Sequence, residues 1–400
     1  CLAAVGICGP IVTLLSSFGT LVGIGGSIWL SMCLGQKNEK RASQILYNSF
    51  VMLVVLSICL TLGFILLKRN LIYWFGGSDA LYPYANTYLT IYTLGTFFAL
   101  MSIGLNYFIT GQGYATIAML SVCIGAITNI IFDFILIRTL KIGVSGAAIG
   151  TVVAQFISCM FVLCFLRFKS KIKLHKEELS IEKMKHIVKL GFSPFLIIAS
   201  DSIILIVMNM MLQKYGGNMG DIYISAITVA QSYFLLITGP LLGISSGTQP
   251  IFAYHFGSQN LKKIKEAFKI VISFAFLFCL IMFIISMCYS NVFVAMFTND
   301  AMTMPIADRA IKIFCLGILM MSIQYVLVDG ITGLSNVKLS LFLSLNRKLM
   351  YLGCTCLLPA FLGVSNIFYA QPVADIYASI VTIICFIKII PSYLKSHGVK

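Results

Sequence analysis

Charged residues are scarce in this sequence. Lysine, arginine, aspartate and glutamate make up 10% of the 400 residues, and only 13 residues are acidic. Soluble globular domains carry roughly 25% charged residues, whereas hydrophobic residues here reach 59%. Because so few polar residues cannot cover a water-facing surface, the composition excludes a soluble globular protein. It indicates a protein that crosses a membrane several times.

Catalytic and metal-binding motifs are also missing. The sequence has no HExxH and no Walker phosphate loop. One G-x-S-x-G string, at 243–247, lies inside an apolar run rather than at a strand-to-helix turn, so neither hydrolysis nor ATP-driven chemistry has support. The 13 cysteines form no CxxC pair, and His255 has no second intramembrane histidine beside it. We therefore expect no enzyme activity and no cofactor. The glycine-rich run at 23–26 is more typical of close helix packing than of a phosphate loop.

The sequence does contain a tandem repeat at one fixed spacing. Gly25, Gly35, Asn38 and Lys40 recur 222 positions later as Gly247, Gly257, Asn260 and Lys262, and the same spacing carries Leu94-Gly95 onto Leu316-Gly317 and Ile109-Thr110-Gly111 onto Ile331-Thr332-Gly333. Glycines and polar residues rarely hold one register through three segments by chance. The repeat therefore predicts two equivalent halves.

Apolar runs of about 20 residues, each long enough to cross a bilayer core, follow one another along the chain. The predicted spans lie near 9–34, 43–67, 87–109, 115–137, 144–166, 190–213, 223–255, 267–290, 312–333, 337–360 and 365–393. A spanning helix satisfies its own backbone hydrogen bonds. The expected fold class is therefore an all-α polytopic membrane protein.

The segment at 190–213 has no partner at the spacing of 222 positions. We therefore expect two six-helix lobes from a parallel repeat, of which the first has only five helices in this sequence. On this interpretation about 30–40 residues, one helix and a flank, precede Cys1, and residues 1–400 alone would not transport. A natural eleven-helix protein is the alternative. The predicted parts are an N-terminal lobe at 1–166, a basic linker at 167–189 and a C-terminal lobe at 190–400.

The basic residues gather on one side of this predicted topology. Loops on that side hold 18 of the 28 lysines and arginines. Because positive residues mark the cytoplasmic face, we expect the linker and the C-terminus inside a bacterial cytoplasmic membrane. The net charge of +15 then needs no nucleic acid to explain it. An amphipathic stretch at 181–188 lies either on the anionic inner leaflet or in a solvated linker.

Four aspartates lie inside predicted spans, where a charge costs at least ~2.5 kcal/mol. They are Asp133, Asp201, Asp329 and Asp375. Asp329 lies about one turn from the inner end of its segment, so we expect an interfacial carboxylate there. Asp201 and Asp375 lie near mid-membrane, where they would either line a second-lobe cavity with Gln231 or act as hydrogen-bonded structural residues.

Asp133 has the most suggestive neighbours. Asn129 lies one helical turn earlier on the same face, and Thr151 lies about 10 Å along the next helix at 1.5 Å per residue. The three polar side chains can therefore meet at one depth. A carboxylate shielded there could exchange a proton, or bind Na⁺ with the amide and hydroxyl oxygens. A structural aspartate would carry the same sequence pattern.

At these residues the sequence resembles the multidrug and toxic compound extrusion (MATE) transporters, over essentially all 400 residues. The matching motifs are Gly25-Gly26-Ser27 with Leu34-Gly35, Asn129-x-x-x-Asp133 with Gly143-Val144-Ser145-Gly146-Ala147-Ala148, Gly191-Phe192-Ser193-Pro194-Phe195, Gly247-Thr248-Gln249-Pro250 with Phe256-Gly257, and Arg347 with Gly363-Val364 and Ala374-Asp375. Each motif is weak alone, but their order and spacing are specific. The motif at 192–195 is closest to the bacterial branch of staphylococcal exporters.

The resemblance implies two lobes around a central cavity and export of organic cations, driven by H⁺ or Na⁺, by a protein we expect to be monomeric. Asn129, Asp133 and Thr151 match the family's first-lobe cation site in position. The family's opening helix often adds an essential aspartate, which this sequence lacks. Two alternatives stay open: a flippase for lipid-linked oligosaccharides, which needs an arginine-lined cavity, and an intramembrane enzyme using Asp201 and Asp375.

Overall fold

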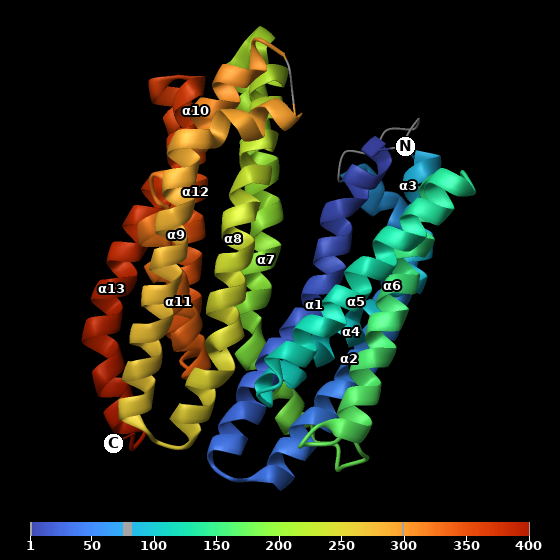
Figure 1. Cartoon of the computed structure of the whole chain (residues 1–400), viewed down its shortest axis with the longest axis vertical. Helices are drawn as coiled ribbons and strands as arrows, with labels where there is room; N and C mark the ends of the chain where they lie inside the picture. The colour runs from blue at the N-terminus through green and yellow to red at the C-terminus, as the bar shows by residue number, and fades with distance from the viewer. Residues whose placement is uncertain (1, 75–81, 298–299, 400) are drawn as a thin grey trace. The chain divides into compact units, whose positions relative to one another are not determined.

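The structure, a computed structural model, describes residues 2–74, 82–297 and 300–399. All regular secondary structure in these ranges is helical (Figure 1). The main helices are α1 (Leu2–Gly35), α2 (Glu39–Trp74), α3 (Tyr82–Leu94), α4 (Thr96–Gly111), α5 (Ala115–Asp133), α6 (Val144–Cys164), α7 (Ile181–Gly216), α8 (Gly220–Gly257), α9 (Leu261–Phe297), α10 (Thr303–Cys315), α11 (Ile318–Gly333), α12 (Val337–Leu362) and α13 (Ala370–Ser396). Short segments follow or precede several of them: η1 (Phe134–Thr139) and η2 (Phe165–Lys169), which are π-helical, and η3 (Gly217–Met219) and η4 (Val364–Tyr369), which are 3-10 turns.

The predicted all-α membrane fold is confirmed. Within the described ranges seven helices are long and apolar enough to cross a membrane, and two bent pairs, α3 with α4 and α10 with α11, bring the number to nine. The two remaining predicted spans, 190–213 and 337–360, lie in α7 and α12. Arg347 and Lys348 lie near the middle of α12 and lower its mean hydropathy. Many large apolar side chains are exposed, as a lipid-facing surface requires.

The repeated Gly-x-x-Asn motif forms the same helix-to-helix turn in each half. Gly35 ends α1 and Gly257 ends α8. The residue before each asparagine is left-handed, with φ of 59° and 56°. Asn38 and Asn260 each accept a hydrogen bond of 3.0 Å from the backbone N–H three residues later, and so cap α2 and α9. The polar residues that reveal the duplication are therefore the residues that build this turn.

The second repeated feature is a bend inside one span of each half. α3 and α4 meet at 55° around Gly95, and α10 and α11 meet at 49° around Gly317. A Cβ on Gly95 would lie 2.5 Å from Val152 of α6, and one on Gly317 would lie 2.9 Å from Pro372 and 3.0 Å from Asp375 of α13. Only glycine fits at either bend. The bend of α10 and α11 therefore lies directly against Asp375.

Glycine also lets α1 and α7 pack closely. A Cβ on Gly25 would collide with the carbonyl oxygen of Ile187 and lie 2.7 Å from the nitrogen of Gly191, and a Cβ on Gly191 would collide with Leu21. The expectation that the glycines near position 25 serve helix packing agrees with these contacts. Its repeat partner Gly247 has no described atom within 4 Å of the same position. Pro250 lies three residues later, inside α8.

The chain divides into two compact units, Cys1–Ala199 and Ser200–Lys400. This division falls inside α7, and the boundaries predicted at 166 and 190 stay predictions. The stretch at 181–188 is not a separate element, because it forms the first turns of α7.

Predicted cytoplasmic loops gather at one end of each unit. In the first unit, the linker contacts the loop after α4 through Ile172 and Gln112 (2.7 Å), and Lys171 pairs with Glu39 at the start of α2 (2.8 Å). In the second unit, the Tyr393 hydroxyl of α13 donates to the carbonyl of Leu334 after α11 (3.1 Å). The loops that the charge pattern assigns to one side are therefore neighbours within each unit.

Candidate functional site

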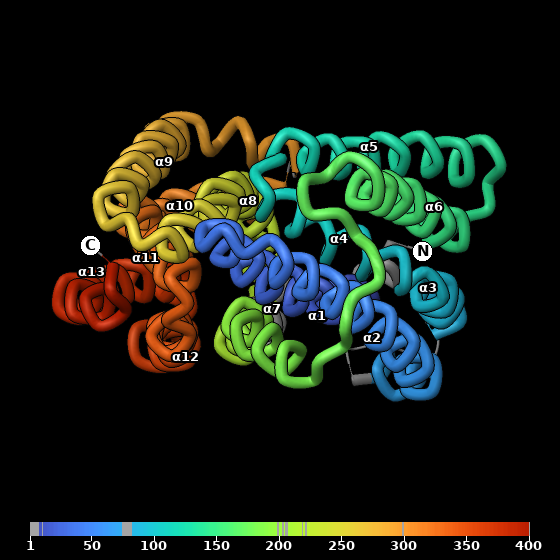
Figure 2. The backbone as a smooth tube through the Cα atoms, turned by 90° about the horizontal axis from the view of Figure 1, so that it is seen from below, coloured from blue at the N-terminus to red at the C-terminus, as the bar shows by residue number. Residues whose placement is uncertain are grey.

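In the first unit, polar side chains meet between α5 and α6, which lie side by side (Figure 2). The Asn129 amide donates to the Thr151 hydroxyl at 3.4 Å, and this hydroxyl donates to the carbonyl of Ala147, one turn earlier in α6, at 2.9 Å. Of the three side chains predicted to meet, Asn129 and Thr151 are thus in contact with each other. The amide and the hydroxyl each have a neutral oxygen atom that can coordinate a cation.

Asp133 is the last residue of α5, directly before the π-helical segment η1. Its Oδ1 lies so close to Gly150 of α6 that a Cβ there would collide with it. This oxygen is buried and has no hydrogen-bond partner among the described residues. The missing side chain at position 150 therefore lets a carboxylate approach the α6 backbone, and the approach leaves one oxygen unsatisfied. A carboxylate oxygen in that state favours a proton or a bound cation.

A pocket of about 480 Å³ lies beside these residues in the first unit. Its polar lining includes Asn129, Thr151, Asn106 and Gln155, and Tyr107 adds an aromatic wall. The Gln155 amide donates to the Tyr92 hydroxyl at 3.1 Å, and the Asn106 amide donates to the Ala118 carbonyl at 3.0 Å. Asp133 does not line the pocket. Asn129, one turn earlier in α5, and Thr151 of α6 do line it.

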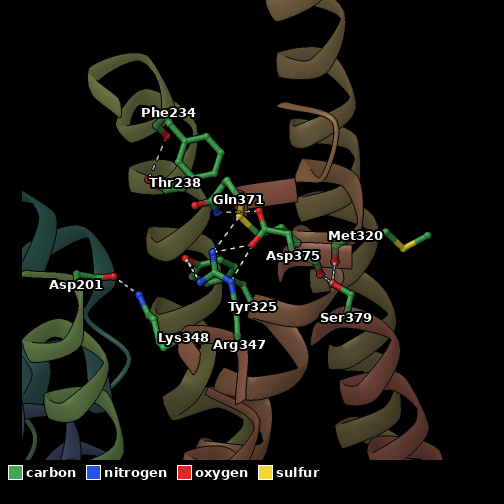
Figure 3. Close-up of polar contacts among 11 residues, drawn as sticks. Asp201, Phe234, Thr238, Met320, Tyr325, Arg347, Lys348, Gln371, Asp375 and Ser379 are labelled. Carbon is green, nitrogen blue, oxygen red and sulfur yellow. Dashed lines mark hydrogen bonds and ion pairs between the residues drawn. The ribbon is translucent and has the colours of Figure 1, made fainter. Parts of the chain in front are cut away.

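The second unit contains a buried ion pair between α12 and α13 (Figure 3). Arg347 donates to Oδ1 of Asp375 through Nε and through a terminal nitrogen, both at 2.8 Å. Gln371 donates to the other oxygen at 2.8 Å, so both carboxylate oxygens are satisfied. Asp375 has no solvent exposure, and the Arg347 guanidinium also donates to the Tyr325 hydroxyl at 3.1 Å. The carboxylate of this pair is fully buried, whereas the Arg347 side chain is 11% exposed.

A second ion pair lies next to it. The Lys348 ammonium donates to Oδ1 of Asp201, which projects from α7. The two partners differ in exposure: the Lys348 side chain is 10% exposed and the Asp201 side chain 60%. Both line a pocket of about 340 Å³, whose walls also include Gln231, Tyr325 and Arg347.

The structure therefore separates the residues predicted for a second-lobe cavity. Asp201 and Gln231 line the pocket, whereas Asp375 lies behind Arg347 and does not. Asp201 and Asp375 bond to different cations, so they do not form the paired carboxylates that an intramembrane protease would use. Lys348 was missed as a site residue, although opposite charges in neighbouring apolar segments were a usable signal.

Asp329 contacts α8. The Gln249 amide of α8 donates to its Oδ1 at 2.8 Å, and its Oδ2 is buried without a hydrogen-bond partner among the described residues. The residue as a whole is partly exposed, and its interfacial position stays a prediction.

Comparisons with known proteins agree with this architecture. The MatE family model matches residues 1–135 and 198–350. Multidrug export protein MepA of Staphylococcus haemolyticus is 25% identical over 382 residues, and MepA of one Staphylococcus aureus strain is 22% identical over 379 residues. Each match covers 94% of this chain and 82% of the relative.

Solved structures show the same fold. A MATE crystal structure in the bent conformation matches with a TM-score of 0.92 and 22% identity, over 99% of this chain and 89% of its own. A MOP superfamily transporter from Pyrococcus furiosus Vc1 matches with a TM-score of 0.93 and 22% identity, over 98% and 88%. These matches identify a multi-pass membrane transporter rather than an enzyme. The chain belongs to the MatE family, the MATE transporters.

Proposed function

We propose that this protein exports organic cations across the bacterial cytoplasmic membrane by alternating access, in exchange for H⁺ or Na⁺. Two kinds of support exist for drug export. The family is one of transporters, and the relatives with 94% coverage of this chain are named multidrug export proteins. Coupling to a cation is inferred from the chemistry of the first-unit site.

The observation that carries the coupling proposal is the unsatisfied oxygen of Asp133. A charged carboxylate in an apolar site has an unfavourable free energy, and binding of a cation or a proton removes this penalty. Asn129 and Thr151 offer neutral oxygen atoms nearby, which suits a hard cation such as Na⁺. When Asp133 binds the coupling ion it would lose its attraction for a cationic substrate. Competition for one carboxylate then links the two flows.

The pocket beside Asp133 suits the proposed cargo. Its lining is neutral and partly aromatic, through Tyr107 and the amides of Asn106, Asn129 and Gln155. Aromatic faces attract delocalised cations, and amides can adapt to varied shapes. We propose that the protein acts as a monomer, with the basic linker and the C-terminus in the cytoplasm.

A lipid-linked oligosaccharide flippase needs an arginine-lined cavity to hold pyrophosphate, and Arg347 lines the second-unit pocket. In the structure Arg347 is neutralised by the fully buried Asp375. Releasing it would leave an unpaired buried charge on either side. This observation favours cation export over the flippase.

The test is ethidium uptake by everted membrane vesicles that contain the full-length protein. We expect accumulation when a pH or Na⁺ gradient is imposed, and collapse of accumulation when that gradient alone is dissipated. Vesicles without the protein are the control. Accumulation that ignores both gradients would overturn coupling, and absence of accumulation under either gradient would overturn cation export.

A further inference from the structure

The pocket of the second unit is lined by two cationic side chains, Arg347 and Lys348. Their carboxylate partners, Asp375 and Asp201, differ strongly in burial. Asp375 is fully buried, and its two oxygens are taken by Arg347 and Gln371. Asp201 is 60% exposed, and Lys348, which it faces, is 10% exposed. Arg347 therefore keeps its carboxylate permanently, whereas Lys348 is paired with a carboxylate that can turn into solvent at little cost.

Lys348 favours a new counter-ion if Asp201 leaves. A buried ammonium without a counter-ion is strongly disfavoured, so an anion that replaces Asp201 would be stabilised there. An ammonium has three donor hydrogens, and Asp201 is the one acceptor found for it among the described residues. The pocket thus contains a buried cation that can accept a new anionic partner.

The other residues that line this pocket indicate what kind of molecule would carry the anionic group. Four aromatic side chains, Phe234, Phe314, Tyr325 and Tyr351, line the same pocket. Its volume of about 340 Å³ lies at the small end of ligand pockets. One flat ring system with one carboxylate fits this combination. A pyrophosphate does not, because Lys348 offers a single displaceable charge.

We propose that the second-unit pocket binds flat aromatic carboxylates, whose carboxylate replaces Asp201 as the partner of Lys348. If the proposed export function holds, on which this inference rests, the exported compounds include aromatic acids and aromatic compounds that carry both an acidic and a basic group. Asp201 then acts as an internal substitute for the ligand, keeping Lys348 paired while the pocket is empty.

Binding of anthracenecarboxylate to the purified protein, followed by its fluorescence, tests the proposal against the neutral anthracenecarboxamide. We expect the acid to bind at least about tenfold more tightly than the amide, because a charged hydrogen bond is added. Lys348→Met should abolish this preference, and Lys348→Arg should retain it. Lys338→Met removes an exposed lysine from the start of the same helix and is the matched control.

Asp201→Asn gives the decisive result, because it removes the internal competitor. We expect it to tighten binding of the acid several-fold and to leave binding of the amide unchanged. If the pair were only structural, Asp201→Asn would weaken both probes or neither, and that outcome would overturn the proposal. Equal binding of acid and amide to the unsubstituted protein would do the same. The assay needs no ion gradient, so its failure leaves the ethidium experiment to decide cation export separately.

Discussion

At the scale of single residues, Asp133 is the group whose charge the proposed coupling requires. Asp133→Asn keeps the size and hydrogen-bonding capacity of the side chain but removes the charge. We expect gradient-driven ethidium accumulation to fall to near background while the amount of inserted protein stays normal. Asn129→Ala and Thr151→Ala should weaken accumulation only partly, since each removes one neutral ligand worth about 1–2 kcal/mol.

A structural aspartate would behave in the opposite way. Asparagine would then substitute well, and alanine would lower the yield of folded protein rather than the accumulation per molecule. Undiminished accumulation by Asp133→Asn would remove this residue from the mechanism.

Gly150 gives an independent test of the same carboxylate. A Cβ at this position would collide with Oδ1 of Asp133, so Gly150→Ala should push the carboxylate out of its place without changing any charge. We expect a loss of ethidium accumulation comparable to that of Asp133→Asn. Gly63→Ala is the matched control, because a Cβ at Gly63 meets no described atom within 4 Å. Normal accumulation in Gly150→Ala would show that the position of this carboxylate is not critical.

The sequence predicted part of this site and missed part for a physical reason. The meeting of Asn129 and Thr151 follows from helix rise and depth alone. The approach of Asp133 to Gly150 and the pairing of Lys348 with Asp201, 147 positions apart, depend on how each helix is rotated about its axis. Hydropathy does not fix that rotation inside a bundle, because most faces are apolar.

At the scale of helices, close packing of α1 on α7 depends on Gly25. Gly25→Ala would place a methyl group against the carbonyl of Ile187 and the backbone of Gly191. Overpacking of this kind costs about 1–3 kcal/mol, so we expect a lower thermal unfolding temperature in detergent. Its repeat partner supplies the comparison: Gly247→Ala meets open space and should change that temperature little. Equal effects of the two substitutions would contradict the packing argument.

The elements themselves were largely predictable. The polar and glycine residues at the spacing of 222 positions marked the turns at Asn38 and Asn260, because capping chemistry needs particular residue types. The same spacing carried Leu94-Gly95 onto Leu316-Gly317, where the helices bend. The sequence did not show that these pairs of residues bend a span, since a lone glycine is equally compatible with a straight helix.

At the scale of the whole molecule, the remaining prediction concerns orientation in the membrane. The basic loops hold 18 of the 28 lysines and arginines and gather at one end of each unit. Positive loops stay in the cytoplasm. In a cysteine-free background, a single cysteine at Lys176 of the linker should react with an impermeant maleimide only after intact cells are permeabilised. A single cysteine at Thr139, between α5 and α6, should react in intact cells.

Both positions are exposed in the structure, so a failure to label cannot be attributed to burial within the protein. Ser78, a natural alternative for the outer reporter, lies outside the described residues. Labelling of both cysteines in intact cells would contradict the predicted topology, because the two loops are separated by one spanning helix, α6. Labelling of position 176 alone in intact cells would reverse the predicted orientation. Labelling of the cysteine at position 139 alone would place the linker inside. It would also place the carboxylate of Asp133 near the outer end of α5. The proposed exchange of cation for substrate would then begin from the outside, where the coupling ion is supplied.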